Sequence, residues 1–283
     1  MSDSGAALAV ELSGLQVAPA AGAERIVLCD LDLRLHAGEQ VAVIGASGAG
    51  KTSLLLALAC AVAPRAGRVR LFGQEPWALA SGARQRLRGR LFLAPQVPPL
   101  PPRQRVVTAV LAGRLPQQGL WQSLRTLWSP RQADAAAAQA ALAALDLPEQ
   151  LWQRVDRLSG GERQRVGLAR LLVSDAELWL VDEPLAALDP ARAERVISHL
   201  SDSARARGAT LVCSLHQVEV ARRRFARILA LRDGRLVYDG PAEALTPERI
   251  RALYGSDPAD WSAPGNAAAS PLSAPPLPQT MCR

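Results

Sequence analysis

The stretch Gly38-Glu-Gln-Val-Ala-Val-Ile-Gly-Ala-Ser-Gly-Ala-Gly-Lys-Thr52 runs from an apolar strand into a glycine-rich loop. Its second half fits GxxxxGK[ST], and the strand before it and the helix expected after it are the context in which that pattern binds phosphate. Glycines let the main chain wrap around a phosphate while nearby amides point inward. The residues predicted to bind nucleotide here are Gly45, Ala46, Ser47, Gly48, Ala49, Gly50, Lys51, Thr52 and Ser53.

Lys51 stands out against the composition of the chain. Of 33 basic residues it is the only lysine, so arginine serves at every other basic position. A lysine in a chain that otherwise uses arginine indicates a chemical requirement for its compact ammonium group. The pattern predicts that Lys51 reaches the β and γ phosphates and that the Thr52 hydroxyl ligates Mg²⁺.

A second motif, Leu178-Trp-Leu-Val-Asp-Glu183, delivers two carboxylates at the end of an apolar run. Nucleotides bind outside the carboxyl ends of such buried strands. We expect Asp182 to hold Mg²⁺, directly or through water, and Glu183 to act as general base toward the attacking water. Taken alone the pair would equally suit a solvated strand end, and the phosphate loop is what favours the catalytic interpretation.

Strands alternate with helices along most of the chain, which predicts a largely parallel sheet. The expected strands are 8–17, 26–35, 38–44, 67–72, 178–181, 210–214 and two around 228–238, and the expected helices are 53–63, 161–173, 191–207 and 217–225. Residues 75–155 have a different character and predict a mostly helical insert, with Ser129 as the cap of a helix over 132–145. Residues 241–254 are expected to form a short helical extension, and 255–283, rich in Pro, Ala and Ser, a disordered tail.

The composition bounds the class of protein. The chain has 283 residues, 49% of them hydrophobic, and a net charge of +7, which suits a globular protein with an anionic ligand or surface. The longest apolar run, residues 54–63, has about ten residues and a bilayer span needs about twenty, so we expect a soluble chain whose membrane role needs a separate partner. The cysteines, Cys29, Cys60, Cys213 and Cys282, lack metal-binding spacing and are expected to be reduced thiols.

A third motif, Leu158-Ser-Gly-Gly-Glu-Arg-Gln164, precedes a helix about twenty residues before the acidic strand. With it the chain resembles the ABC ATPase family over residues 8–240. The resemblance implies an α/β fold with a P-loop NTPase (RecA-like) core, an antiparallel β subdomain and a helical ABC insert. It also implies that Ser159, Gly160 and Gly161 contact the γ-phosphate of ATP held by a second subunit.

The same resemblance suggests roles for three more residues. Gln96 matches the Q-loop glutamine, which ligates Mg²⁺ or the attacking water. Asp189, in Ala187-Leu-Asp189, matches the D-loop at the dimer seam. His216 matches the switch histidine that contacts the γ-phosphate. ATP and Mg²⁺ are thus the implied cofactor set, with Lys51, Gln96, Glu183 and His216 as the implied catalytic residues.

Several stretches are similar to the phosphonate importer ATPases in particular: 113–115, 120–124, 153–161, 214–223 and 231–240. The resemblance implies a homodimer of ATPase subunits at the cytoplasmic face of the inner membrane. It would join integral membrane permease subunits fed by a periplasmic substrate-binding protein. We further expect the tryptophans of the insert, Trp77, Trp121, Trp128 and Trp152, and the segment Pro95–Pro102 to lie near the permease. The alternative is that these tryptophans fill the core of the insert.

Three alternatives remain at this level: an ABC importer ATPase for another solute such as phosphate, an amino acid or a metal, a soluble ABC ATPase acting on nucleic acid, and a small-molecule kinase. No nucleic-acid partner is expected, because such proteins usually carry two domains of this kind or a long coiled coil. The signature motif and His216 argue against a kinase. The motifs alone do not distinguish import from export.

The chain departs from the family at the adenine site. Family members place an aromatic residue there, whereas residues 1–71 contain no Phe, Tyr or Trp, and the equivalent segment lies near Val17–Arg25. Alanine and proline precede Gln96 where an aromatic residue is usual, and the D-loop has alanine where serine is common.

We expect GTP and ATP to be hydrolysed at comparable rates, because aliphatic or arginine side chains distinguish the bases poorly. Competition between the two nucleotides measures this directly. A strong preference for ATP would contradict it.

Overall fold

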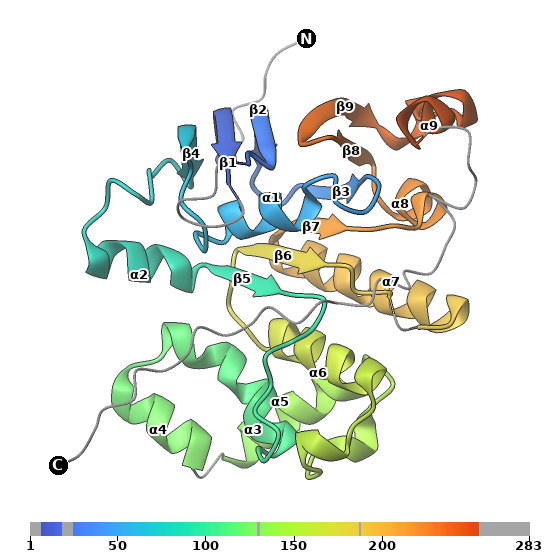
Figure 1. Cartoon of the computed structure of the whole chain (residues 1–283). Coiled ribbons are helices and arrows are strands. Elements are labelled where there is room, and N and C mark those ends of the chain that lie inside the picture. Colours follow the sequence, from blue (N-terminus) through green and yellow to red (C-terminus); the bar gives the residue numbers. More distant parts are fainter. Residues whose placement is uncertain (1–6, 19–24, 129–130, 187, 255–283) are drawn as a thin grey trace, which may run out of the picture.

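The computed structural model describes residues 7–18, 25–128, 131–186 and 188–254, and two sheets organise them (Figure 1). The larger sheet has the order β5-β6-β7-β3-β8-β9, and all its neighbouring pairs are parallel except β8 and β9. Its strands are β3 (Gln40–Ile44), β5 (Leu91–Ala94), β6 (Leu178–Asp182), β7 (Thr210–Ser214), β8 (Arg227–Arg232) and β9 (Arg235–Pro241). The smaller sheet is antiparallel, with the order β2-β1-β4, and consists of β1 (Leu8–Val17), β2 (Leu28–His36) and β4 (Ala66–Leu71). The predicted parallel core and antiparallel subdomain are confirmed.

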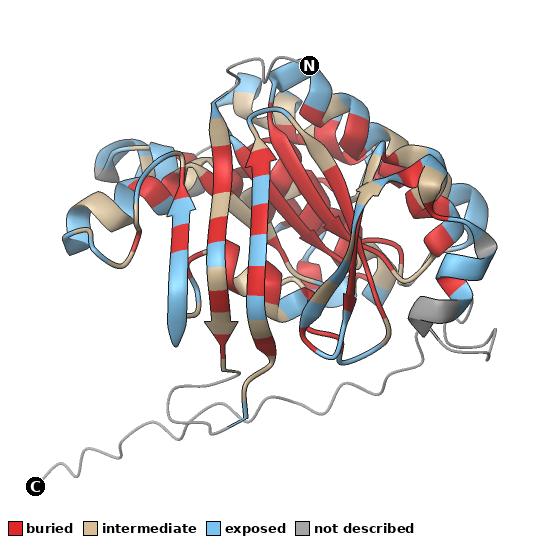
Figure 2. Cartoon of the chain, turned by 90° about the horizontal axis from the view of Figure 1, so that it is seen from above, coloured by how far each residue is buried: buried red, intermediate tan, exposed pale blue. Residues whose placement is uncertain are grey.

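The central strands bury both faces. Along β3, Val41 and Val43 join one apolar cluster, while Ala42 and Ile44 join another on the opposite face. This alternation follows from the two-residue period of a strand and explains why the strand has no polar face. Helix α1 (Lys51–Leu58) belongs to the first cluster and lies between the two sheets, as Figure 1 shows. Figure 2 shows the buried residues concentrated in the strands, with exposed residues on the outer faces of the helices.

Helices cover the second face and form the lower part of the molecule in Figure 1. Between β5 and β6 the chain makes α3 (Val106–Leu111), α4 (Leu120–Trp128), α5 (Gln132–Ala143) and α6 (Gly160–Leu172). The remaining helices are α2 (Ser81–Gly89), α7 (Pro190–Arg207), α8 (Val218–Arg224) and α9 (Pro247–Tyr254), and short 3-10 turns cover 112–117, 148–150, 155–157 and 242–244.

The segment 75–155 is mostly helical, but it also contains β5, which pairs with β6 in the central sheet. One predicted boundary is wrong. The helix expected over 53–63 ends at Leu58, since Cys60 adopts a left-handed conformation (φ 55°) that stops it. The predicted cap Ser129 lies outside the described residues, and the N-cap of α5 is Arg131.

The insert does not build its core from its described tryptophans. Trp121 is 84% exposed and Trp152 is 58% exposed, while Trp77 packs against the other side of the central sheet, with the Arg84 guanidinium 5.2 Å from its ring centre. Small aliphatic residues such as Val110 and Leu142 fill the insert instead. Trp121 and Trp152 therefore do not pack in the core of the insert. The side chain of Trp128 lies outside the described part.

The remaining expectations concern membrane-spanning helices, the C-terminal segment and the cysteines. No helix within the described ranges has the length and apolarity to cross a bilayer. The segment 255–283, expected to be a disordered tail, lies outside the described residues, as does Cys282; of the other cysteines, Cys60 and Cys213 are buried.

Candidate nucleotide site

The phosphate loop links the carboxyl end of β3 to the start of α1, and two of its glycines are sterically required. Gly45 has φ 153°, and a β-carbon there would lie 2.4 Å from the carbonyl oxygen of Leu231. Gly50 has φ 104°, and a β-carbon there would lie 2.7 Å from Leu28 Cδ2. Both positions combine a left-handed conformation with close packing, which only glycine accommodates. The loop is thus held between β2 and the β8–β9 hairpin, where Gly234 N donates to Ala49 O (3.2 Å).

Lys51 reaches back over this loop. Its Nζ donates to Gly45 O (2.7 Å) and Ala46 O (3.2 Å) and lies 4.0 Å from Glu183 Oε1. The side chain is only 4% exposed. Burial lowers the pKa of Lys51, and the charges of Glu183 and Asp182 oppose that shift. The ammonium is therefore placed among phosphate-loop carbonyls and beside two carboxylates.

Asp182 stands at the end of β6 and is held by two hydroxyls. Thr52 Oγ1 donates to Asp182 Oδ2 (2.9 Å), and Ser214 Oγ donates to Oδ1 (2.6 Å). Burial raises the pKa of Asp182, although both hydrogen bonds favour its ionised form. The phosphate loop and the acidic strand end thus meet through Thr52 and Asp182, two of the three residues predicted as Mg²⁺ ligands.

Glu183 follows directly and contacts the predicted switch histidine. His216 Nε2 lies 2.5 Å from Glu183 Oε1, a distance at which the histidine donates the proton. Burial opposes ionisation of Glu183, but the hydrogen bond and charge of His216, together with Lys51, outweigh it and lower the pKa of this carboxyl. Glu183 is consequently ionised at neutral pH, as a general base must be.

Two residues without a predicted role also contact this centre. Ser214 is the last residue of β7, and besides bonding Asp182 its Oγ accepts from Glu183 N (2.9 Å). Gln164 Nε2 donates to Glu183 O (2.8 Å) from helix α6. Ser214 ends β7 two residues before His216, at the sheet edge where β6 also ends. Its position at the end of an apolar strand is the feature of the sequence from which a role at this site could have been predicted.

Other predicted residues lie apart from the Lys51–Glu183 cluster or show no contact with it. Gln96 is exposed two residues beyond β5, at the sheet edge where β6 ends. Ser159 caps α6, accepting from Glu162 N (3.3 Å) while Glu162 bonds back to Ser159 N (2.8 Å). Gly160 and Gly161 begin that helix, and Asp189 caps α7 by accepting from Arg192 N (3.0 Å). Ala187 lies outside the described residues, as does most of the segment expected to face adenine.

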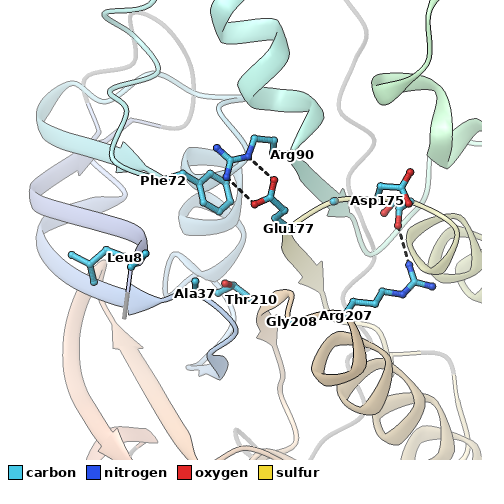
Figure 3. Close-up of a pocket in the computed structure, with 12 residues that line it drawn as sticks. Leu8, Ala37, Phe72, Arg90, Asp175, Glu177, Arg207, Gly208 and Thr210 are labelled. Carbon is cyan, nitrogen blue, oxygen red and sulfur yellow. Dashed lines mark hydrogen bonds and ion pairs between the residues drawn. The ribbon is translucent and has the colours of Figure 1, made fainter. Parts of the chain in front are cut away.

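A separate hollow of about 620 Å³ lies at the opposite, amino-terminal edge of the central strands (Figure 3). Arg90 pairs with Glu177 through two bonds (2.6 and 2.8 Å) and stacks over the Phe72 ring, while Arg207 donates to the carbonyls of Ser174 and Leu172. Both arginine side chains in this hollow therefore donate to protein oxygens in the structure.

Comparison with known proteins shows the family of the chain. The ABC transporter family profile matches residues 28–186. The chain belongs to the ABC transporter family. Its fold and sequence are those of the ATP-hydrolysing cassette of that family, so it is an ATPase.

Sequence relatives cover nearly the whole chain. The phosphonates import ATP-binding protein PhnC 2 of Albidiferax ferrireducens is 57% identical over 257 residues, spanning 90% of this chain and 92% of its own. PhnC 2 of Pseudomonas aeruginosa is 52% identical over 250 residues, spanning 88% and 92%.

Solved structures share the fold, and one of them is an exporter. The dimeric post-hydrolysis ATP-binding cassette MJ0796 with ADP and Pi superposes with a TM-score of 0.72 at 27% identity, covering 82% of this chain and 98% of that chain. A bacterial Atm1-family ABC exporter with ATP bound gives 0.69 at 26% identity, covering 84% and 40%. The predicted fold class is confirmed, and because an exporter shares it, the fold alone does not specify import.

Proposed function

We propose that this chain powers the uptake of a phosphonate or a related phosphorus compound by hydrolysing ATP. The contact between the phosphate loop and the acidic end of β6, through Thr52 and Asp182, carries the hydrolytic part of the proposal. The cargo rests on relatives named for phosphonate import, which match almost over their full length. Phosphonate, phosphite or an organophosphate ester would all fit.

The site residues divide the chemistry between them. Lys51 would leave the loop carbonyls to neutralise the β and γ phosphates of ATP. Because Lys51 and His216 both approach Oε1 of Glu183, Oε2 is the oxygen left to accept a proton from the attacking water. His216 would contact the γ-phosphate as that proton moves, and Gln96 would approach the water or the metal as its loop closes.

The donor set fits Mg²⁺. Thr52 and Asp182 offer a hydroxyl and a carboxylate, the hard oxygen ligands that this ion prefers. Asp182 is a buried carboxylate whose pKa is raised by burial, and a nearby divalent cation would relieve the cost of its charge. When bound, Mg²⁺ would neutralise charge that develops on the phosphates. Thr52 and Asp182 would hold it, with Gln96 as a third ligand.

A homodimer would complete each site. Ser159, Gly160 and Gly161 form an exposed helix start whose amides suit an anion, and they would contact ATP held by the second copy, with Asp189 at the seam. ATP binding would then draw the copies together, and hydrolysis would release them.

We expect the helical insert to contact an integral membrane permease at the cytoplasmic face of the membrane. Trp121, Leu124 and Val97 expose large apolar side chains near the start of this insert, where solvent contact is unfavourable. In hydrogen exchange, amides of residues 95–128 are expected to gain protection when the permease is present. Val237, an exposed apolar residue of β9, serves as the internal control. Unchanged protection over 95–128 would remove the interface from the proposal.

Growth of the source bacterium tests the cargo. A strain whose only copy carries Glu183→Gln is compared with wild type and with a Glu219→Gln control, whose carboxylate is exposed on α8. Loss of growth on methylphosphonate as sole phosphorus source, with normal growth on phosphate, is the expected result. Normal growth on both sources, or failure on both, would contradict the phosphonate assignment.

A further inference from the structure

Gln164 is a buried amide that points at the main chain of Glu183. It lies in the second turn of α6 and is 5% exposed. Its Nε2 donates to Glu183 O (2.8 Å), while its buried Oε1 has no hydrogen-bond partner among the described residues. A buried polar atom without a partner is costly, so the side chain is kept in place at a cost to stability.

The main chain at Glu183 needs such support. Glu183 has φ 48°, a left-handed conformation that is unfavourable for a residue with a β-carbon. Side chains from two other elements hold its polar atoms, because its N–H donates to Ser214 Oγ (2.9 Å) and its carbonyl accepts from Gln164. A strained backbone conformation persists only where the surrounding structure holds it in place. Here the conformation of Glu183 directs its carboxylate toward His216 and Lys51.

Helix α6 is itself closely fixed. Its first residues are Gly160 and Gly161 of the signature motif. One turn beyond Gln164, Gly167 packs against the loop that follows β5, and a β-carbon at Gly167 would lie 2.8 Å from Pro98 Cβ. Helix α6 therefore begins with the residues predicted to contact the γ-phosphate, bonds to the main chain of Glu183, and packs against the loop that carries Gln96.

We propose that Gln164 is a positioning residue for hydrolysis: its amide ties helix α6 to the main chain of Glu183 and thereby aims the carboxylate. The inference rests on the proposed role of Glu183 as general base. In this role Gln164 acts through the backbone of Glu183 and not on the reacting atoms.

A double-mutant cycle with the purified full-length chain tests the idea. Gln164→Leu keeps a similar volume and removes the donor, and it is expected to lower kcat for ATP hydrolysis about tenfold while KM for ATP changes less than about twofold. In the Glu183→Gln background it is expected to lower the residual rate no further, because the group that it aims is gone. A kcat within twofold of wild type, or an equal loss in both backgrounds, would overturn the proposal.

Two further variants separate this role from general destabilisation. Val166→Ala removes buried apolar contacts from the same helix without touching Glu183, and it is expected to lower the melting temperature but keep kcat. Gln164→Glu can donate only when protonated, so its rate relative to wild type should rise as the pH falls; a pH-independent ratio would overturn the proposal even if Gln164→Leu failed to fold. Wild-type activity of Glu183→Gln itself would instead refute the assigned base.

Discussion

Glu183→Gln is expected to lower kcat for ATP hydrolysis by about 10²- to 10⁴-fold, the usual contribution of a positioned general base. Glutamine keeps the shape and can still contact His216, but it cannot accept a proton from water. ATP binding should persist, because Lys51 and the phosphate loop are unchanged. Phosphate release by the purified chain measures the rate, and light scattering with ATP should reveal a longer-lived dimer, since hydrolysis no longer opens it.

Glu219→Gln is the matched control, because that carboxylate is exposed and, within the described residues, pairs with Arg222 in its own helix. It should hydrolyse ATP like wild type. Since His216 and Lys51 lower the pKa of Glu183 below its ordinary value, the wild-type base should stay ionised from neutral into mildly acidic pH. Substantial hydrolysis by Glu183→Gln at any of these pH values would mean that another group takes the proton.

Lys51→Arg should reduce kcat about 10²-fold or more, although it preserves the charge. The Nζ atom lies within hydrogen-bond distance of Gly45 O and Ala46 O in a position that is almost fully enclosed. A planar guanidinium is larger than an ammonium and cannot rotate its donors in the same way. Nucleotide affinity, measured by calorimetry or by a fluorescent ATP analogue, should fall together with the rate.

The reciprocal change provides the control. Arg205→Lys places a lysine on the exposed face of α7, where the pair with Asp202 is solvent-screened, and should leave both affinity and rate unchanged. Equal activity of Lys51→Arg and wild type would show that a positive charge is sufficient. The single lysine would then reflect chance and not chemical necessity.

The nucleotide site could be predicted from sequence because its members end consecutive buried strands. Lys51 and Thr52 follow β3, Asp182 ends β6 and Glu183 follows it, and His216 follows β7, so the parallel arrangement alone brings them to one edge. Gln164 lies in the signature motif, but the sequence predicts no role for it, because its bond to a backbone carbonyl depends on how α6 packs. No local pattern specifies that contact.

Secondary structure was misjudged where local signals were weak. Strand β5 has only four residues and is flanked by arginines and prolines, so its pairing with β6 decides its conformation. The end of α1 depends on the single left-handed residue Cys60, where the apolar run through residue 63 suggested a longer helix. The exposure of Trp121 likewise depends on which face of α4 packs inward, which composition does not reveal.

The near absence of lysine makes this chain selectively labelable. Among its 283 residues Lys51 carries the only side-chain amine. An acylating or aldehyde reagent small enough to enter therefore has one side-chain target, and a nucleotide contacting that amine would shield it. Mass spectrometry of the modified peptide would then report nucleotide occupancy inside an intact membrane preparation, without an introduced probe. For the same reason, amine-to-amine cross-linkers cannot join neighbouring copies through surface lysines.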